Sequence, residues 1–350
     1  MCTDFLLLAA DKDNSVVNGR SMEYGLNLGS QILIGGRGTH KQSATPDSDT
    51  GGLSWTAKHG YLGLNAAGLG LKDMIADGMN EKGLSIGALW LPGYAQYNPA
   101  VNNNARALEV TLVTNWVLGN FATVAEVELG LKDIEVWGKV SQNTHMPLHF
   151  SIHDAHGSSA VLEFIADNTQ GLWRANPVGV LTNSPPFTWQ LSNIGNYAGL
   201  AALDAAPIEI NGTPFPPPGH GSGMRGLPGD STPPSRFVRI VFQKQFAKQP
   251  ANNAEATSLA LHLFNTVDIP RGTSAAQNPL DGDDHTQWVV VKGLTAKTFS
   301  YRSADNPTLM QINFAELDLD DASEVGYKMP QEATCIDITE QLVRVKAGSR

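Results

Sequence analysis

The sequence predicts an α+β fold in which sheets pack between layers of helices. The 350 residues include 35 Gly and 20 Pro, which indicates many turns between short strands rather than long helices. Apolar patterns typical of strands and of helices also alternate along the chain, in the order strands, helices, strands, helices, strands. Since no internal repeat and no change in composition marks a linker, we expect a single domain over residues 1–350.

The first half of the chain begins with strands and continues into two helices. Residues 5–10 form an apolar run, and residues 15–24 are its expected hairpin partner. We expect a helix between Asn104, a candidate N-cap, and Gly119, because apolar residues recur there at every fourth position. Further strands are expected at 31–34, at 61–65 and on both sides of the turn at 80–83, and a second helix at 124–131.

The second half repeats this order. Residues 148–165 alternate around His156 and Gly157 as a hairpin does. Residues 211–235 are so rich in Pro and Gly that we expect a long loop there, acting as a lid beside a pocket. The remaining expected elements are helices at 185–203, 236–246 and 254–266, and strands at 287–292, 298–302, 309–314 and 342–345.

Composition excludes several classes of protein. With 41% hydrophobic and 17% charged residues, the chain is unlike a disordered protein. Its two cysteines, Cys2 and Cys335, are too far apart for a disulfide framework or a zinc finger. No apolar run approaches the roughly 20 residues that cross a bilayer. A net charge of −10 argues against nucleic acid or anionic lipid as a partner.

The N-terminal residues do not look like a secretory signal. The acidic Asp4 stands where basic residues are expected, and the apolar run that follows is too short. We therefore expect a cytoplasmic protein, or a periplasmic one if a leader is missing from this sequence.

Cys2 directly follows the initiator methionine. Removal of Met1 would expose a residue with both a thiol and an α-amine, groups whose reference pKa values are about 8.5 and about 8. One residue could then act as nucleophile and as base. Position alone favours a simply buried cysteine. However, the expected hairpin returns Arg20 and Glu23 to Cys2, where an arginine favours the thiolate and a carboxylate can hold the ammonium.

A series of short motifs then points to a known family. They are Met-Cys-Thr at 1–3, Gly-Arg-Ser-Met-Glu-Tyr at 19–24, Asn-Glu-Lys-Gly-Leu at 80–84, Leu-Pro-Gly-Tyr at 91–94, Leu-Thr-Asn-Ser-Pro-Pro-Phe at 181–187, Leu-Pro-Gly-Asp at 227–230 and Ser-Arg-Phe-Val-Arg at 235–239. Together and in this order, they resemble the motifs of the choloylglycine hydrolase family, which includes bile salt hydrolases and penicillin V acylases. Each motif alone is weak, but the ordered set is specific.

The resemblance implies a four-layer αββα sandwich of the N-terminal nucleophile hydrolases. It implies hydrolysis of a non-peptide amide in a small acyl substrate, without cofactor or metal, and a homotetramer. Cys2 would attack the carbonyl with Arg20 against its sulfur, and Asn183 would donate to the oxyanion. Arg236 matches the family's late active-site arginine. Glu23 replaces the usual Asp, which leaves open how the α-amine is held.

Trp90 distinguishes branches of the family. Bile salt hydrolases have Asn at this place and Gram-positive penicillin V acylases have Tyr, and in the family the backbone N–H here completes the oxyanion hole. Trp90 resembles the Gram-negative branch, whose members hydrolyse penicillin V and N-acyl homoserine lactones. Its ring would give the pocket a broad apolar wall, to which Tyr24 and Phe187 are expected to add.

We therefore expect a cysteine acylase of N-acyl homoserine lactones or penicillin V. The alternatives are a bile salt hydrolase and an inactive binding relative. A glutamine amidotransferase of the same fold fits less well, because such enzymes usually continue Cys-Gly where this chain has Thr3, and carry a second domain.

Three other patterns suggest less. The histidines at 145, 149, 153 and 156 would align on a helix as metal ligands, but strand alternation is the better interpretation and places them on a solvent face. The glycine-rich turn at 35–38 lacks the Lys-Ser/Thr ending of a phosphate-binding loop. Asn80 has good turn chemistry, so we interpret it as structural.

Overall fold

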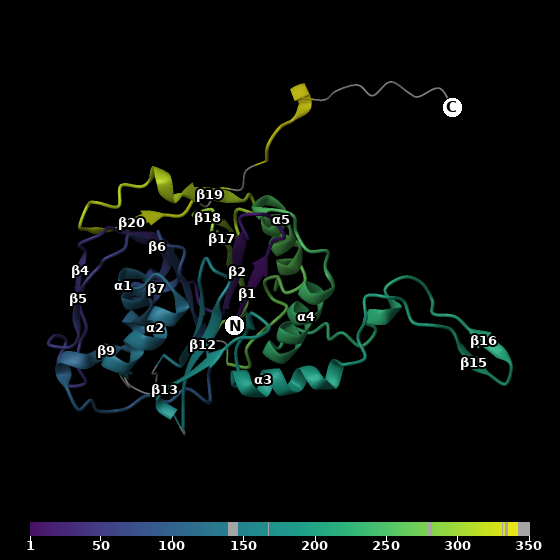
Figure 1. Cartoon of the computed structure of the whole chain (residues 1–350), viewed down its shortest axis with the longest axis horizontal. Coiled ribbons are helices and arrows are strands. Elements are labelled where there is room, and N and C mark those ends of the chain that lie inside the picture. Colours follow the sequence, from purple (N-terminus) through teal and green to yellow (C-terminus); the bar gives the residue numbers. More distant parts are fainter. Residues whose placement is uncertain are drawn as a thin grey trace.

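Two antiparallel sheets lie face to face, and helices cover both outer faces (Figure 1). The computed structural model describes residues 1–138, 146–166, 168–278, 280, 282–330, 332 and 335–341. The arrangement is the predicted αββα sandwich, so this prediction is confirmed. The expected strand at 342–345 lies outside the described residues.

The first sheet joins the two ends of the chain. Its central strands β2 and β17 pair Glu23 with Thr286, although these residues are far apart in sequence. The β1–β2 hairpin pairs Cys2 with Met22, so the N-terminus begins inside the sheet. In spatial order the strands are β14 (Val180–Leu181), β1 (Cys2–Leu8), β2 (Val16–Tyr24), β17 (His285–Gly293), β18 (Thr298–Ser303) and β19 (Met310–Asn313).

The second sheet is wider and closes with a strand from the C-terminal part. In spatial order its strands are β13 (Asn168–Ala175), β12 (Ser159–Ile165), β11 (Leu148–His153), β8 (Ser85–Trp90), β7 (Leu71–Asn80), β6 (Tyr61–Ala66), β3 (Gln31–Gly35) and β20 (Glu324–Lys328). Asn80 ends β7, and its side chain accepts from the amides of Lys82 and Leu84 and donates to two carbonyls of the α1 region. The structural interpretation of Asn80 fits these contacts.

Helices from different parts of the chain cover the two sheets. In Figure 1, α1 (Val113–Asn120) and α2 (Val124–Gly130) lie on the second sheet's side, and α4 (Pro233–Phe246) and α5 (Asn253–Phe264) lie on the first sheet's side, with α3 (Phe187–Ile194) beside α4. The side chains of Thr123 and Asn252 cap α2 and α5 by accepting from backbone amides. Pro233 starts α4, where its missing N–H costs nothing.

Two expected helices are shorter than predicted. The chain between Asn104 and Gly119 is α-helical only from Val113. Before it, the strand β9 (Ala107–Glu109), which pairs with β10 (Glu135–Trp137), lies between two single 3-10 turns. The apolar residues that recur at every fourth position are buried or half-buried, but they lie in a strand, a short turn and α1 rather than along one continuous helix. The helix expected at 185–203 covers only α3 and a following turn.

The Pro- and Gly-rich segment differs from the expected lid. Its first residues form β16 (Thr213–Phe215), which pairs with the preceding β15 (Ile208–Ile210) in a small hairpin that projects away from the two sheets (Figure 1). A second small hairpin, β4 (His40–Gln42) with β5 (Ser54–Thr56), lies at the other end of the molecule. Since β15–β16 points outward, this part of the segment does not cover a pocket.

Candidate active site

Cys2 is almost completely buried, at 2% exposure, where β1 begins between the two sheets. Arg20 lies on the partner strand β2, and its Nη2 donates to Cys2 Sγ at 3.1 Å and to the carbonyl of Ala88 at 2.8 Å. The guanidinium is therefore within hydrogen-bonding distance of the sulfur. The hairpin therefore brings together the nucleophile and the cation that the sequence singled out.

The backbone of Cys2 is held by Asn183 and Arg236. Strand β14 pairs with β1, and the register of Leu181 opposite Asp4 brings Asn183 beside Cys2. Asn183 Oδ1 accepts from Cys2 N at 2.6 Å and from Arg236 Nη2 at 2.9 Å. Arg236, in the first turns of α4, also donates to the Cys2 carbonyl at 2.5 Å. These contacts join three distant parts of the sequence around one residue.

The amide nitrogen of Asn183 faces strand β8. Its Nδ2 donates to the carbonyl of Trp90 at 2.7 Å. Because a carboxamide carries two N–H donors, this contact leaves one hydrogen, which has no partner within the described part of the chain. Asn183 thus has one donor available beside Cys2.

Glu23 is fully buried close to these groups without touching Cys2. Its Oε1 accepts from Thr286 Oγ1 at 3.1 Å, and its Oε2 lies 3.9 Å from Arg236 Nη1. Burial raises the pKa of Glu23, against the opposing attraction of Arg236 and of the N-terminal amine. The backbone carbonyl of Glu23, rather than its carboxylate, accepts from the Met1 amine. The carboxylate's expected role at the α-amine stays a prediction.

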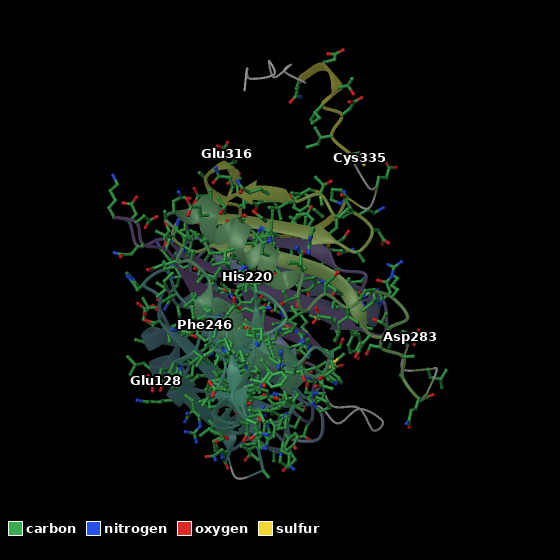
Figure 2. All side chains as sticks on the ribbon, turned by 90° about the vertical axis from the view of Figure 1, so that its right-hand side faces the viewer. Glu128, His220, Phe246, Asp283, Glu316 and Cys335 are labelled. Carbon is green, nitrogen blue, oxygen red and sulfur yellow. The ribbon has the colours of Figure 1, made fainter. Side chains whose placement is uncertain are left out.

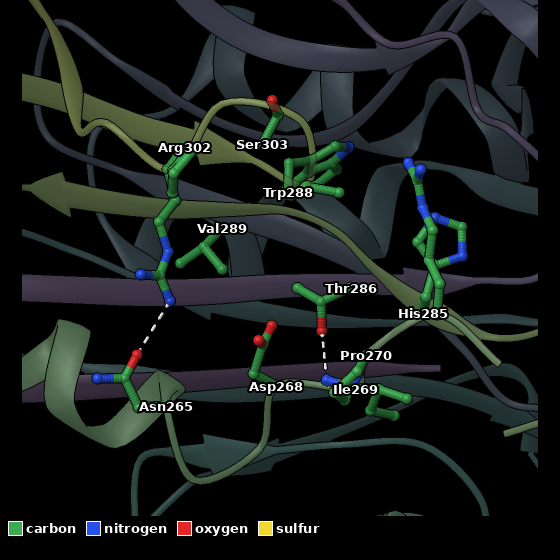
Figure 3. Close-up of a pocket in the computed structure, with 13 residues that line it drawn as sticks. Asn265, Asp268, Ile269, Pro270, His285, Thr286, Trp288, Val289, Arg302 and Ser303 are labelled. Atoms are coloured by element: carbon green, nitrogen blue, oxygen red, sulfur yellow. Dashed lines mark hydrogen bonds between the residues drawn. The ribbon is translucent and has the colours of Figure 1, made fainter. Parts of the chain in front are cut away.

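Thr286 connects Glu23 with the molecular surface. Besides donating to Glu23, its Oγ1 accepts from the amide of Ile269 at 2.9 Å. This contact lies at a surface cavity of about 290 Å³ that also includes His285 and Trp288 (Figure 3). The cavity therefore lies behind Glu23 rather than beside the nucleophile.

An apolar cavity of about 40 Å³ lies next to Cys2. Tyr24 and Trp90 both line it, and their rings meet edge to face with centroids 5.7 Å apart. Phe187 is not among its lining residues. It is fully buried and packs on Phe237 at the α3–α4 contact, which corrects the prediction that it forms a pocket wall. Other lining side chains are Met1, Met22, Leu28, Leu69, Met74 and Met146.

On the other side of Arg20, the sheets enclose charges that the sequence interpretation missed. Lys292 Nζ and Asp77 Oδ1 are 2.5 Å apart, and both side chains are fully buried. Asp4 Oδ1 accepts from Ser151 Oγ at 2.8 Å and lies 2.6 Å from His153 Nε2. Burial alone would raise the pKa of Asp4, but the attraction of His153, with contributions from Lys292 and Arg20, holds it below its ordinary value.

The histidines of β11 correct another expectation. His149 and His153 are fully buried between the sheets rather than on a solvent face, because both faces of this central strand are covered. His149 Nδ1 lies 3.0 Å from Glu163 Oε1. His145 lies outside the described residues. Among those that are described, no group of three or more His, Cys, Asp and Glu side chains could hold a metal ion.

The remaining cysteine lies far from this site. Cys335 is exposed on the C-terminal segment, away from the sheets (Figure 2). None of the helices in the described ranges combines the length and apolar character needed to cross a bilayer.

Comparison with known proteins agrees with the arrangement of Cys2 in its sandwich. The model of the family "linear amide C–N hydrolases, choloylglycine hydrolase family" matches residues 2–327. The chain belongs to this family. It is therefore a linear amide C–N hydrolase of the N-terminal nucleophile type, and the resemblance found in its motifs is confirmed.

Members of the choloylglycine hydrolase family resemble the chain over nearly its whole length. A bile salt hydrolase/transferase from Clostridium perfringens is 29% identical, with 94% of this chain and 97% of that protein covered. A crystal structure of a conjugated bile acid hydrolase variant from the same species has a TM-score of 0.83 at 27% identity, covering 97% and 100%. A penicillin V acylase structure from Agrobacterium tumefaciens has a TM-score of 0.71 at 26% identity, covering 92% and 89%.

Proposed function

We propose that this hydrolase cleaves the amide bond of N-acyl homoserine lactones or of penicillin V, with Cys2 as the nucleophile after removal of Met1. The observation that carries the proposal is the placement of Cys2 Sγ, 3.1 Å from the Arg20 guanidinium and beside a cavity walled by Trp90 and Tyr24. An apolar wall suits an aliphatic or phenoxy acyl group, which loses little by leaving water.

The proposed reaction proceeds in two halves. Cys2 Sγ attacks the acyl carbon while the α-amine takes the thiol proton, and the carbonyl oxygen gains the negative charge. The free N–H of Asn183 stabilises that oxyanion. Collapse breaks the C–N bond, and the α-amine returns its proton to the leaving nitrogen. Water then attacks the thioester, again losing a proton to the α-amine, and Cys2 leaves as the thiol when the acid departs.

Entry of an acyl group requires the cavity to widen, since about 40 Å³ holds little more than one water molecule. Several of its walls are methionines, whose unbranched side chains adopt many shapes at low cost. Met1 is one of them, so its removal also enlarges the cavity. Met22, Met74 and Met146 would then adapt to the length of the acyl chain.

Bile salt hydrolysis is the second candidate, because a relative that carries this name covers nearly the whole chain. Parallel assays of glycocholate, penicillin V and a long-chain acyl homoserine lactone separate the candidates, with Cys2→Ala as control. We expect turnover of the lactone or of penicillin V well above that of glycocholate. Fast turnover of glycocholate alone would overturn the proposal in favour of the second candidate.

We also propose that the chain forms a homotetramer. The projecting β15–β16 hairpin exposes Ile208, Ile210 and Phe215, and nearby Leu203 is exposed as well. Apolar side chains gathered on an extended arm are costly unless a partner covers them. Light scattering after size-exclusion chromatography should give four times the chain mass, and Ile210→Asn with Phe215→Ser should lower it. A monomeric wild type would contradict this proposal.

A further inference from the structure

A second cavity lies beyond Met1, on the side away from the apolar cavity. It measures about 410 Å³. Met1, Tyr24 and Trp90 line both spaces, so these three residues form a wall that the two spaces share. Loss of Met1 removes part of this shared wall, and Cys2 lines the apolar cavity on one side of it. With the acyl group in the apolar cavity, the bond to be cleaved lies at Sγ, and the leaving amine occupies this second cavity, which we call the leaving-group cleft.

The charged side chain that lines the leaving-group cleft is a carboxylate. Among its described lining residues, Asp284 is the only one with a charged side chain. Its Oδ2 lies 3.9 Å from the Met1 amine, and its side chain is 31% exposed. The remaining walls are neutral, including Leu26, Pro92 and the small residues 274–276. Removal of Met1 takes this ammonium away, and the new α-amine is the nitrogen of Cys2, which Asn183 Oδ1 holds.

The nearby arginines lie outside the cleft, although Arg236 and Asp284 attract each other through the interior. Arg20 and Arg236 are fully buried, and neither lines the cleft. Arg20 is bound to Cys2 Sγ and the Ala88 carbonyl. Arg236 is bound to the Cys2 carbonyl and lies 3.9 Å from Glu23. A ligand in the cleft therefore meets the Asp284 carboxylate at the rim, and the described lining residues offer it no cationic side chain.

We propose that Asp284 is a specificity-determining residue that disfavours leaving amines bearing a carboxylate or sulfonate and favours electrically neutral ones. The inference rests on the proposed amide hydrolysis at Cys2 and sharpens it. Like charges within a few ångströms repel, and the partial burial of Asp284 weakens the screening by water. The neutral ring of a homoserine lactone suits the cleft, whereas penicillin V and glycine or taurine conjugates all place an anion there.

The test uses two substrates with the same acyl chain. N-decanoyl homoserine lactone has a neutral leaving amine, and its ring-opened form, N-decanoyl homoserine, carries a carboxylate. A second pair, N-decanoyl glycinamide and N-decanoyl glycine, repeats the charge difference without the ring. We expect the wild type to prefer each neutral member by about tenfold in kcat/KM. Asp284→Asn should bring both ratios near one, and Asp284→Lys should reverse them.

Asp283→Asn is the matched control. It removes the same charge from the adjacent residue, which is exposed at the edge of the molecule and does not line the cleft (Figure 2). Its two ratios should equal those of the wild type. Raising the salt concentration from 0.1 M to 1 M shortens the Debye length from about 10 Å to about 3 Å, so the wild-type ratios should fall while those of Asp284→Asn stay constant.

Equal kcat/KM for both members of each pair in the wild type, or ratios unchanged in Asp284→Asn, would overturn the role of Asp284 and leave the proposed hydrolysis intact. If none of the four amides is hydrolysed, the proposed hydrolysis of acyl homoserine lactones fails instead. Calorimetric binding of the same four amides to Met1-free Cys2→Ala then decides on Asp284. A preference for the neutral members that Asp284→Asn abolishes supports the proposal, and equal binding overturns it.

Discussion

The two sides of Cys2 differ in almost every physical respect. Towards Trp90 lies a small apolar cavity with several methionines in its walls. Behind Arg20, the same two sheets enclose Asp77, Lys292 and Asp4, all fully buried. Apolar contacts are non-directional and tolerate movement, whereas buried charges require fixed partners. We infer that the apolar side adapts to the substrate and the charged side holds Arg20 in place.

Gly87 shows how closely the charged side is packed. A Cβ at this glycine would lie 2.7 Å from Arg20 Nη1, closer than Cβ atoms come in practice, and 3.0 Å from Asp77 Oδ1, which is also a tight contact. Strand β8 therefore needs glycine where the arginine passes towards Cys2. Asp77 stands next to Arg20 as well as to Lys292, so one carboxylate balances two cations.

The largest effect is expected from breaking the charged side. Asp77→Asn leaves Lys292 buried without its counter-charge, which should lower the free energy of unfolding by about 3–5 kcal/mol. Urea unfolding measures this. Asp320→Asn, which removes an exposed partner of Arg37, should cost much less, because water screens that pair. Replacing the pair together, with Asp77→Leu and Lys292→Met, should recover part of the loss. If Asp77→Asn lowered the free energy of unfolding as little as Asp320→Asn, the charged side of Cys2 would not depend on fixed partners as we infer.

The next largest effect concerns Asn183, at the boundary between the sides. Asn183→Ala should lower kcat by about 10²–10³ through loss of the oxyanion donor. Asn183→Asp separates two roles, because it keeps an acceptor for Cys2 N and Arg236 but has no N–H to donate. If it is as slow as Asn183→Ala, the donor matters. Near-normal turnover by Asn183→Asp would mean that Asn183 only holds the N-terminus.

A smaller effect is expected from the apolar side. Trp90→Ala should lower kcat/KM for penicillin V by about tenfold, mainly through KM, because an aromatic contact to the acyl group is lost. The free energy of unfolding should change less than in Asp77→Asn. Tyr94→Ala removes an exposed aromatic ring that lines neither cavity, and should leave the kinetics unchanged. A larger loss of stability than of substrate affinity would show that the apolar side is also rigid.

The smallest effect is a pH dependence of stability. Because the folded-state pKa of Asp4 lies below its ordinary value, ionised Asp4 stabilises the fold above about pH 4. This contribution is lost as the pH falls towards the folded-state pKa, with a slope of at most about 1.4 kcal/mol per pH unit. Urea unfolding between pH 3 and pH 7 should show a smaller slope for Asp4→Asn. If the free energy of unfolding of the wild type and of Asp4→Asn changed with pH at the same slope, Asp4 would not be a source of the pH dependence.

The contrast also explains which features were predictable from the sequence. The apolar pattern identified the β1–β2 hairpin, and short motifs pointed to Asn183 and Arg236, because local chemistry and family resemblance agree there. Asp77 and Lys292 were missed, although each is a single charge within an apolar strand run, a pattern that signals a buried pair. The partner of each buried charge depends on how the two sheets face each other. The spacing of apolar residues along the chain does not contain that information.

The errors have related causes. Alternation around His149 and His153 indicated a solvent face, but it cannot distinguish solvent from a polar layer between sheets. Phe187 was assigned to the pocket from its motif, whereas its direction is set by the packing of α3 on α4. In both cases the secondary structure was right, and the surroundings came from distant parts of the chain.

The central claim is that Cys2, freed of Met1, carries the acyl group during turnover. Mass spectrometry of the purified chain, before and after brief mixing with N-decanoyl homoserine lactone and acid quenching, tests this claim directly. We expect a chain without Met1, an added decanoyl group on the peptide that begins with Cys2, and neither adduct nor turnover in Cys2→Ala. Full turnover by a chain that keeps Met1, or by Cys2→Ala, would contradict the account.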